Sequence, residues 1–241
     1  MSALAGSAGS ALGLAGLVTA VEYFFRHYVL FWMPTLGTLR VNDMVALALA
    51  YSMLTVVAGT LAGVDWRREL AGILHALREF TTRWSSTRWI LALMLSLVVL
   101  SVVDGWLWGD VRLPMWASAY RNPRVWFAPA AFPLTALAMI AVNGLLVPIC
   151  EEYLWRGLIQ PGFRRVLPGA AAIAVTAILF SLKHVLVDAS AARFLALVAF
   201  GGICGSVAAR HGWKTSAALH LFVNTITTAV SLAVAGAGGR G

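Results

Sequence analysis

Residues 129–157 read PAAFPLTALAMIAVNGLLVPICEEYLWRG, and this stretch decides how the chain folds. The part from 129 to 149 has no charged side chain and is long enough to cross the hydrocarbon core of a bilayer as a helix. Two carboxylates and an arginine follow at once, within EEYLWR. Ionisable groups at membrane depth are candidates for function. The stretch therefore predicts a spanning helix that carries a polar site. The alternative is an ordinary charge cluster where a helix leaves the bilayer.

The two glutamates of this stretch face different directions on a helix. Glu152 and Arg156 are four residues apart, so they share one face and can pair. Glu151 is turned about 100° away from Glu152 and is expected to lack that partner. A carboxylate among apolar residues without a countercharge holds its proton nearer to neutral pH, as a general base or acid requires. Glu151 is therefore the candidate for acid–base chemistry.

The composition of the whole chain indicates an integral, multi-pass membrane protein. Of its 241 residues 60% are hydrophobic and 12% are charged, and the mean hydropathy is +0.82. A soluble domain of this size could not bury so much apolar surface. The net charge of +8 comes from basic residues that are mostly arginines scattered among loops. They are typical of membrane topology signals, so we expect the lipid bilayer as a partner and no nucleic acid.

Apolar segments of spanning length recur along the chain and predict an all-α, polytopic membrane helix bundle with about seven transmembrane helices, or eight. The expected spans are residues 12–33, 44–64, 89 to about 107, 129–149, 169 to about 184, 194–209 and 216–234. The fourth helix should continue through the acids until Gln160, Pro161 and Gly162 break it. We expect three parts: N-terminal spans in 1–128, a core that carries the site in 129–236, and a short tail in 237–241.

The remaining segments predict how the bundle sits in the membrane. Residues 65–88 alternate apolar and basic positions, which predicts a basic amphipathic helix on the cytoplasmic surface. An aromatic loop is expected outside, with Trp106, Trp108, Trp116, Tyr120 and Trp126 at the interface. Basic residues at 67–88, 164–165 and 210–214 fall on one side, so the amino terminus should be cytoplasmic. The preference for Arg over Lys suggests a bacterial inner (plasma) membrane. The first residues lack a basic signal region and are expected to stay attached.

The other polar residues and the cysteines of the apolar segments are not expected to take part in the site. In the first span Glu22, Arg26 and His27 are expected to pair locally or to lie at an interface, apart from a catalytic site. Cys150 and Cys204 lie in apolar segments without metal or redox spacing, so no disulfide is expected.

Two further spaced pairs lie in apolar helices of the last part. FSLKH holds Phe180 and His184, and HLFVN holds His220 and Asn224, each four residues apart. On a helix His220 and Asn224 share one face, where both can donate hydrogen bonds toward one point. Together with Glu151 these groups suit peptide hydrolysis by an activated water. Glu151 would take the proton and His184 would hold the water. His220 and Asn224 would donate to the developing oxyanion.

EEYLWR, FSLKH and HLFVN, in this order on separate helices, resemble the motifs Glu-Glu-x-x-x-Arg, Phe-x-x-x-His and His-x-x-x-Asn of the CPBP family. This family comprises type II CAAX prenyl endopeptidases and bacteriocin-processing or immunity-related membrane proteins, and is also called the Abi family. The resemblance does not reach the first 128 residues. It implies a glutamic intramembrane endopeptidase that cleaves a membrane-embedded or membrane-anchored peptide or protein. The implied catalytic residues are Glu151, His184, His220 and Asn224, with support from Glu152, Arg156 and Phe180.

Three points stay open at the level of the sequence. Glu151, Lys183 and His184 could instead form the ion path of a proton-coupled transporter, or the chain could be a non-catalytic immunity or scaffold protein. No cofactor is expected to be required; zinc, if bound, would take Glu151, His184 and His220 as ligands. Counting 1.5 Å per residue from the loop at 161–168 places Glu151 about 14 Å deep and His184 about 24 Å deep, so the two would meet only if the fifth helix started late or tilted.

Overall fold

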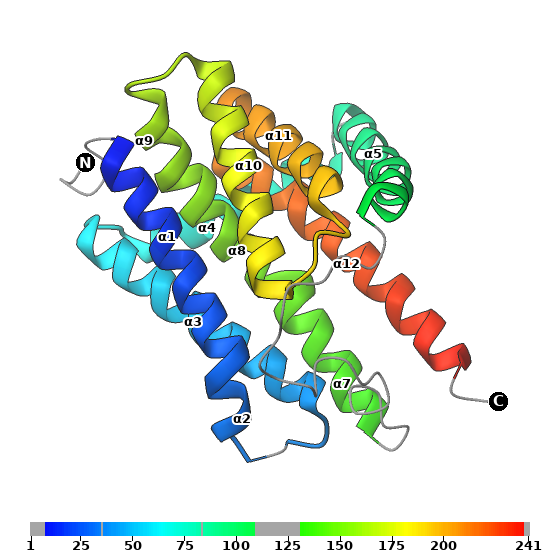
Figure 1. The fold of residues 1–241 in the computed structure, drawn as a ribbon. Coiled ribbons are helices and arrows are strands. Elements are labelled where there is room, and N and C mark those ends of the chain that lie inside the picture. The colour runs from blue at the N-terminus through cyan, green and yellow to red at the C-terminus, as the bar shows by residue number, and fades with distance from the viewer. Residues whose placement is uncertain (1–7, 35, 83, 109–130, 239–241) are drawn as a thin grey trace.

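The computed structural model describes residues 8–34, 36–82, 84–108 and 131–238, which form a bundle of helices without a β-strand element (Figure 1). Seven helical segments are long and apolar enough to cross a membrane, so the predicted all-α polytopic bundle is confirmed. They are Ala8–Val29, Leu39–Leu61, Arg88–Trp108, Phe132–Arg164, Gly169–Asp188, Phe194–His211 and Trp213–Val234.

The helices follow one another closely along the chain. The first part contains α1 (Ala8–Phe24), η2 (Phe25–Val29), α2 (Leu30–Trp32), α3 (Leu39–Leu61), α4 (Trp66–Thr82) and α5 (Trp84–Trp108). The second part contains α7 (Phe132–Ala138), η5 (Met139–Leu146), α8 (Val147–Glu152), η6 (Tyr153–Ile159), α9 (Gln160–Arg164), α10 (Gly169–Asp188), α11 (Phe194–His211) and α12 (Trp213–Gly238).

The helix that carries the acids is longer than the sequence predicts. It runs from α7 to α9 without a break, and two π-helical segments, η5 and η6, precede its prolines Pro148 and Pro161. A proline ring clashes with the carbonyl one turn earlier, and a wider π turn is one way in which a helix absorbs such an irregularity. The expected end at Gln160 is therefore wrong. Measured from Arg164 back to Glu151 and from Gly169 on to His184, the two depths become about 20 Å and about 22 Å, and the discrepancy largely disappears.

Small residues let α10 and α11 pack closely beside this helix. A Cβ atom added at Gly201 of α11 would lie 2.9 Å from the Cα atom of Ala177 in α10. One added at Gly205 would lie 2.7 Å from Oε1 of Gln160 in α9. Where α11 begins, Asp104 of α5 accepts hydrogen bonds from the backbone N–H groups of residues 195 and 196, at 3.0 and 2.9 Å. These contacts hold α11 against the helices that form the site.

The segment expected to lie on the surface is the helix α4. Its apolar residues concentrate on one side of the helix, so it is amphipathic as predicted; Ile73 and Phe80 are buried in the bundle, whereas Leu70 and Leu74 are exposed. Its buried side packs against α12, where the rings of Phe80 and Phe222 are 5.5 Å apart. Its location at the cytoplasmic surface stays a prediction.

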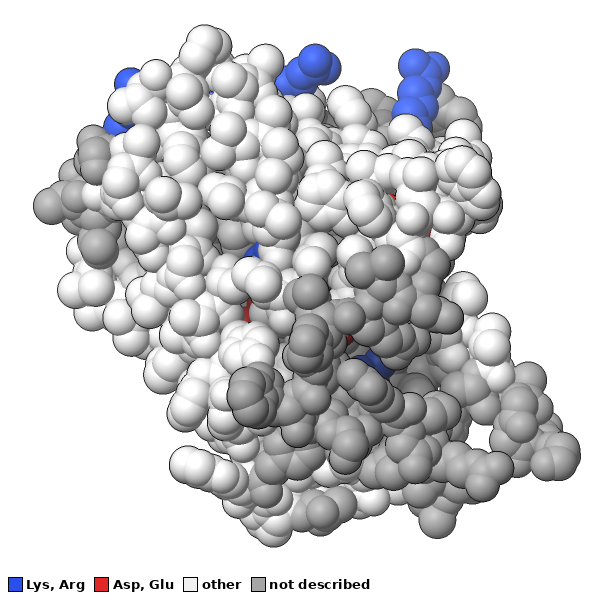
Figure 2. Space-filling view, viewed as in Figure 1, with Lys and Arg blue, Asp and Glu red and all other residues white. Residues whose placement is uncertain are grey.

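Exposed Lys and Arg side chains gather at one end of the visible face (Figure 2). Arg164, Arg165 and Arg210 are exposed at helix ends. This arrangement agrees with basic loops on one side of a membrane, while the cytoplasmic assignment stays a prediction. Of the expected aromatic loop, Trp106 and Trp108 lie exposed at the end of α5, and the part from 109 to 130 lies outside the described residues.

Candidate active site

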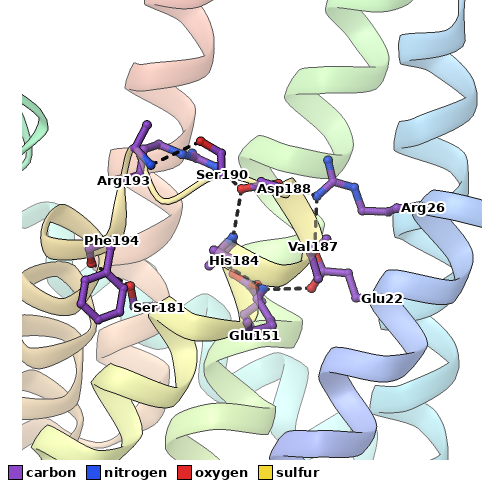
Figure 3. A network of polar contacts seen from close by, with 12 residues as sticks. Glu22, Arg26, Glu151, Ser181, His184, Val187, Asp188, Ser190, Arg193 and Phe194 are labelled. Carbon is purple, nitrogen blue, oxygen red and sulfur yellow. Dashed lines mark hydrogen bonds and ion pairs between the residues drawn. The ribbon is translucent and has the colours of Figure 1, made fainter. Parts of the chain in front are cut away.

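Three residues predicted for the site, Glu151, His184 and His220, come together from α8, α10 and α12. His184 Nε2 lies 3.9 Å from Glu151 Oε1, and His220 Nε2 lies 3.7 Å from Glu151 Oε2. Figure 3 shows His184 beside Glu151 within the bundle, with Asp188 on the other side of the imidazole. Glu151 and His220 are only 3% and 2% exposed. The carboxylate of Glu151 therefore lies at a buried position between two imidazole nitrogens.

Glu152 is paired as the helical spacing predicts. Arg156 Nη1 lies 3.0 Å from Glu152 Oε1, and both side chains are fully buried. Ser216 donates its hydroxyl hydrogen to Glu152 Oε2 at 2.6 Å, and His220 Nδ1 lies 3.0 Å from Glu152 Oε1. Because an ionised carboxylate only accepts hydrogen bonds, this contact assigns the proton of the imidazole to Nδ1. In that tautomer the lone pair of His220 Nε2 faces Glu151.

The expectation that Glu151 lacks a countercharge is wrong. Lys183 Nζ lies 2.5 Å from Glu151 Oε1, and Tyr51 of α3 contacts the same oxygen through its hydroxyl at 2.6 Å. Lys183 precedes His184 in the sequence, and both side chains reach Glu151. Tyr51 is a fully buried residue of an apolar helix, where nothing in its sequence neighbourhood marks it as part of a site.

Glu22 of α1 also belongs to the site, against expectation. Its predicted local pair exists, since Arg26 Nη1 lies 3.6 Å from Glu22 Oε1. Its other oxygen, Oε2, contacts Lys183 Nζ at 2.9 Å and the Tyr51 hydroxyl at 2.5 Å. The available sequence signal was an acid inside an apolar span, which is costly unless it has a partner.

A second carboxylate lies behind His184. Asp188 Oδ2 is 3.7 Å from His184 Nδ1, one helical turn further along α10. Arg26 Nη1 lies 3.0 Å from Asp188 Oδ1, and Arg193 contacts Asp188 as well. Arg26 also donates from Nε to Asp43 Oδ1 at 2.9 Å. The four-residue spacing of His184 and Asp188 is the signal that sequence reasoning missed.

Phe180 packs at the centre of the site. Its ring lies edge-on to Trp155 at 5.4 Å and to His184 at 4.9 Å, measured between ring centroids. The guanidinium carbon of Arg156 lies 4.6 Å from the Phe180 centroid, and Lys183 Nζ lies 5.1 Å from it. An aromatic face attracts cations, so this ring supports both basic side chains.

Asn224 lies one turn beyond His220 on the same wall of the site. Its Nδ2 donates to the backbone oxygen of Asn143 at 3.1 Å, and Asn143 in turn donates from Nδ2 to Thr228 at 2.9 Å. Asn143 belongs to the π-helical segment η5. An amide group carries two N–H donors, so the bond to Asn143 engages only one of them.

These residues line a cavity of about 420 Å³ in the bundle. Glu151, His184, His220 and Asn224 all face it, and so does Glu22. Apolar side chains complete the walls, among them Met44, Leu47, Val147, Phe200 and Val223. Polar and apolar side chains contribute in similar measure to these walls, and convergent polar groups in a cavity are typical of a binding or active site.

The site does not have the donor geometry that a zinc ion needs. Among the residues that the structure describes, no group of three or more His, Cys, Asp or Glu side chains is arranged to hold a metal ion. Glu151, His184 and His220 were the predicted ligands, but the Lys183 ammonium already contacts Glu151 Oε1 and repels a second cation. These residues do not fit a zinc ion as they stand. That no cofactor is required stays a prediction.

Part of the chain matches a known protein family. Residues 133–226 match the family model described as type II CAAX prenyl endopeptidase Rce1-like. This match supports membership in the CPBP family. The matched segment holds all three motifs of the CPBP resemblance, whereas Glu22 and Tyr51 lie outside it. Because the family is one of proteases, the match supports a peptidase. No curated protein and no solved structure matches the chain.

Proposed function

We propose that this protein is a glutamic intramembrane endopeptidase in which Glu151 activates the attacking water. One observation carries the proposal. The Nε2 atoms of His184 and His220 lie 3.9 and 3.7 Å from the two carboxylate oxygens of the buried Glu151. Such distances are too long for direct hydrogen bonds and suit a water molecule bridging the groups.

The reaction would begin when this water attacks the carbonyl carbon of the scissile peptide bond. Glu151 takes a proton from the water as general base, and His184 and His220 hold the water in line. When the carbon–nitrogen bond breaks, Glu151 returns that proton to the leaving amine. The carboxylate is thereby restored, and the water oxygen remains in the new carboxyl group.

The other residues position these groups. Glu152 holds His220 Nδ1, which directs the Nε2 lone pair toward the water. Arg156 and Ser216 in turn hold Glu152. We assign the oxyanion to Asn224, whose amide keeps one N–H after its bond to Asn143. His220 would join it as a donor only in the doubly protonated state.

The proposed substrate is a membrane-embedded or membrane-anchored peptide or protein. The cavity lies in a bundle of apolar helices, and its walls combine polar and apolar side chains, which suits a peptide segment that arrives from the bilayer with a polar backbone and apolar side chains. Candidates are a prenylated carboxy-terminal tripeptide, a bacteriocin leader or the membrane anchor of a sorting signal. The proposed location is a bacterial inner membrane with a cytoplasmic amino terminus.

The first experiment tests the base. Purified protein in lipid nanodiscs would be offered quenched fluorescent peptides with a farnesylated carboxy-terminal Cys-a-a-X sequence and, separately, single-helix membrane peptides. Glu151→Gln removes the base but keeps its shape, so turnover should fall by about 10² to 10⁴-fold while the thermal unfolding temperature stays near that of the wild type. Glu79→Gln, at a partly exposed carboxylate of α4 outside the site, is the matched control and should retain full turnover. A folded, active Glu151→Gln protein would rule out the mechanism.

The same assay separates the alternatives. A strong chelator should leave wild-type turnover unchanged; loss that zinc restores would make His184 and His220 metal ligands. A scaffold or transporter would cleave no peptide, and comparison of protein termini in cells carrying wild-type or Glu151→Gln protein would then show no difference in cleavage products.

A further inference from the structure

Four buried side chains form a closed ring behind Glu151. The Lys183 ammonium contacts Glu151 Oε1 at 2.5 Å, Glu22 Oε2 at 2.9 Å and the Tyr51 hydroxyl oxygen at 2.9 Å. The Tyr51 hydroxyl also lies 2.5 Å from Glu22 Oε2 and 2.6 Å from Glu151 Oε1. All four residues are at most 3% exposed. The ring joins α1, α3, α8 and α10.

Each contact of this ring needs one hydrogen between its two polar atoms. Each of the three Lys183 contacts takes one N–H of the ammonium group. The two short oxygen–oxygen contacts of Tyr51 need one hydrogen each, but the phenol has a single O–H. Two oxygens at such distances without a hydrogen between them repel one another. A carboxylic acid must therefore supply the second hydrogen, which means that one of the two glutamates is protonated.

The contacts also indicate which glutamate is neutral. Hydrogen bonds between two charged groups are shorter than those with one neutral partner, and the ammonium lies closer to Glu151 than to Glu22. The negative charge therefore belongs to Glu151.

We propose that Glu22 is held as a neutral carboxylic acid and acts as a positioning residue for Glu151. Its proton is donated to the Tyr51 oxygen, which directs the phenolic O–H and the Lys183 ammonium onto Glu151. Glu151 is then the one carboxylate of the ring, in the form that a base needs. This inference rests on the proposed function of Glu151 but concerns a residue outside the segment matched by the family.

An infrared measurement tests the protonation state without a substrate. Protein in nanodiscs at neutral pH should show a carboxylic acid C=O band in the difference spectrum of wild type minus Glu22→Gln. The difference spectrum for Glu79→Gln, a partly exposed acid of α4, should lack this band. Absence of the band in the first spectrum would overturn the proposal.

Turnover of the farnesylated reporter peptide tests the positioning role. Glu22→Gln serves only the infrared measurement, because its amide nitrogen in the place of Glu22 Oε2 can donate to Tyr51 but cannot accept from the Lys183 ammonium. Glu22→Met, of similar size but without a donor, and Tyr51→Phe should each lower kcat about tenfold or more with little change in KM. Tyr23→Phe, on the same helix as Glu22 and outside the ring, is the control and should not change kcat.

The outcomes separate this inference from the proposed function. If the infrared band is absent while Glu151→Gln is inactive, Glu22 is an anion and the inference is wrong, but Glu151 remains the base. If Glu151→Gln is active, the proposed function fails, and the infrared band alone decides the state of Glu22.

Discussion

The two oxygens of Glu151 have different surroundings. Oε1 is held by Lys183 and Tyr51, whereas Oε2 has the imidazole of His220 at 3.7 Å. The first set fixes the carboxylate in place and the second leaves an oxygen available to a water. The neighbouring Glu152 has no such freedom, since Arg156, Ser216 and His220 occupy it. Two adjacent glutamates thus have different chemistry because their partners differ.

Asn224→Ala should lower turnover about 10² to 10³-fold with little change in KM, because it removes a donor that is needed only as charge develops on the oxyanion. Thr225→Ala is the control. Thr225 donates to the backbone oxygen of Gly144 in the same π-helical segment, at 3.3 Å, but does not line the cavity. Steady-state kinetics in nanodiscs measures both. Turnover of Asn224→Ala within a fewfold of the wild type would remove the oxyanion role.

Arg156→Ala should destabilise the protein by about 3 to 5 kcal/mol, because removal of one partner of a buried ion pair leaves the other charge uncompensated. Thermal unfolding in detergent measures this loss, and lower activity should accompany it. Arg164→Ala, at an exposed position near the end of the same helix, should have little effect. Unchanged stability with lost activity would instead give Arg156 a direct chemical role.

At the scale of elements, the site depends on how closely three helices approach one another. The helix of the acids is continuous to Arg164, which brings Glu151 to the depth of His184. Gly201 of α11 allows contact with Ala177 of α10, and its backbone oxygen accepts a hydrogen bond from Arg156 Nη2 at 3.3 Å. A glycine is needed at this point because the neighbouring backbone leaves no room for a side chain.

Gly201→Ala should lower stability by about 1 to 3 kcal/mol, since its Cβ atom would lie 2.9 Å from the Ala177 Cα atom and force α10 and α11 apart. Gly202→Ala is a close control, because no atom lies within 4 Å of its added Cβ atom. Thermal unfolding of both variants in detergent compares them. An equal response of the two would mean that the close approach of the helices does not limit stability.

At the scale of the whole molecule, the N-terminal helices complete a site whose motifs lie in the C-terminal part. Tyr51 and Glu22 reach Glu151 or its partner Lys183, and Arg26 connects α1 and η2 to Asp43 of α3 and Asp188 of α10. The expected division near residue 128 stays a prediction. The contacts make the two parts interdependent, since the ring behind Glu151 needs both.

Arg26→Ala should destabilise the whole bundle by about 3 to 5 kcal/mol, because the fully buried Asp43 loses its closest cation. Turnover should fall as well, since Asp188 behind His184 loses one of its two arginine contacts. Arg68→Ala breaks an exposed pair with Asp65 and should change stability by less than about 1 kcal/mol. Similar unfolding temperatures for the two variants would show that the Arg26 network does not hold the helices together.

Composition and the length of apolar segments were enough to predict the spanning helices, and the ordered motifs followed from the resemblance to a known family. Apolar length alone decides whether a segment can cross a bilayer, because every backbone polar group must be satisfied within the helix. The pair of Glu152 and Arg156 was predictable for a similarly local reason, since side chains four residues apart are neighbours on any α-helix.

The partners of Glu151 were decided only by the tertiary structure. Lys183, Tyr51 and Glu22 come from three other helices, and helical periodicity does not say which faces of separate helices meet. The sequence suggested an unpaired carboxylate because residue spacing identifies the partners of Glu151 only on its own helix. Packing of α1, α3 and α10 around α8 supplied the countercharge and the ring, because a buried carboxylate is stable only when neighbouring helices compensate it.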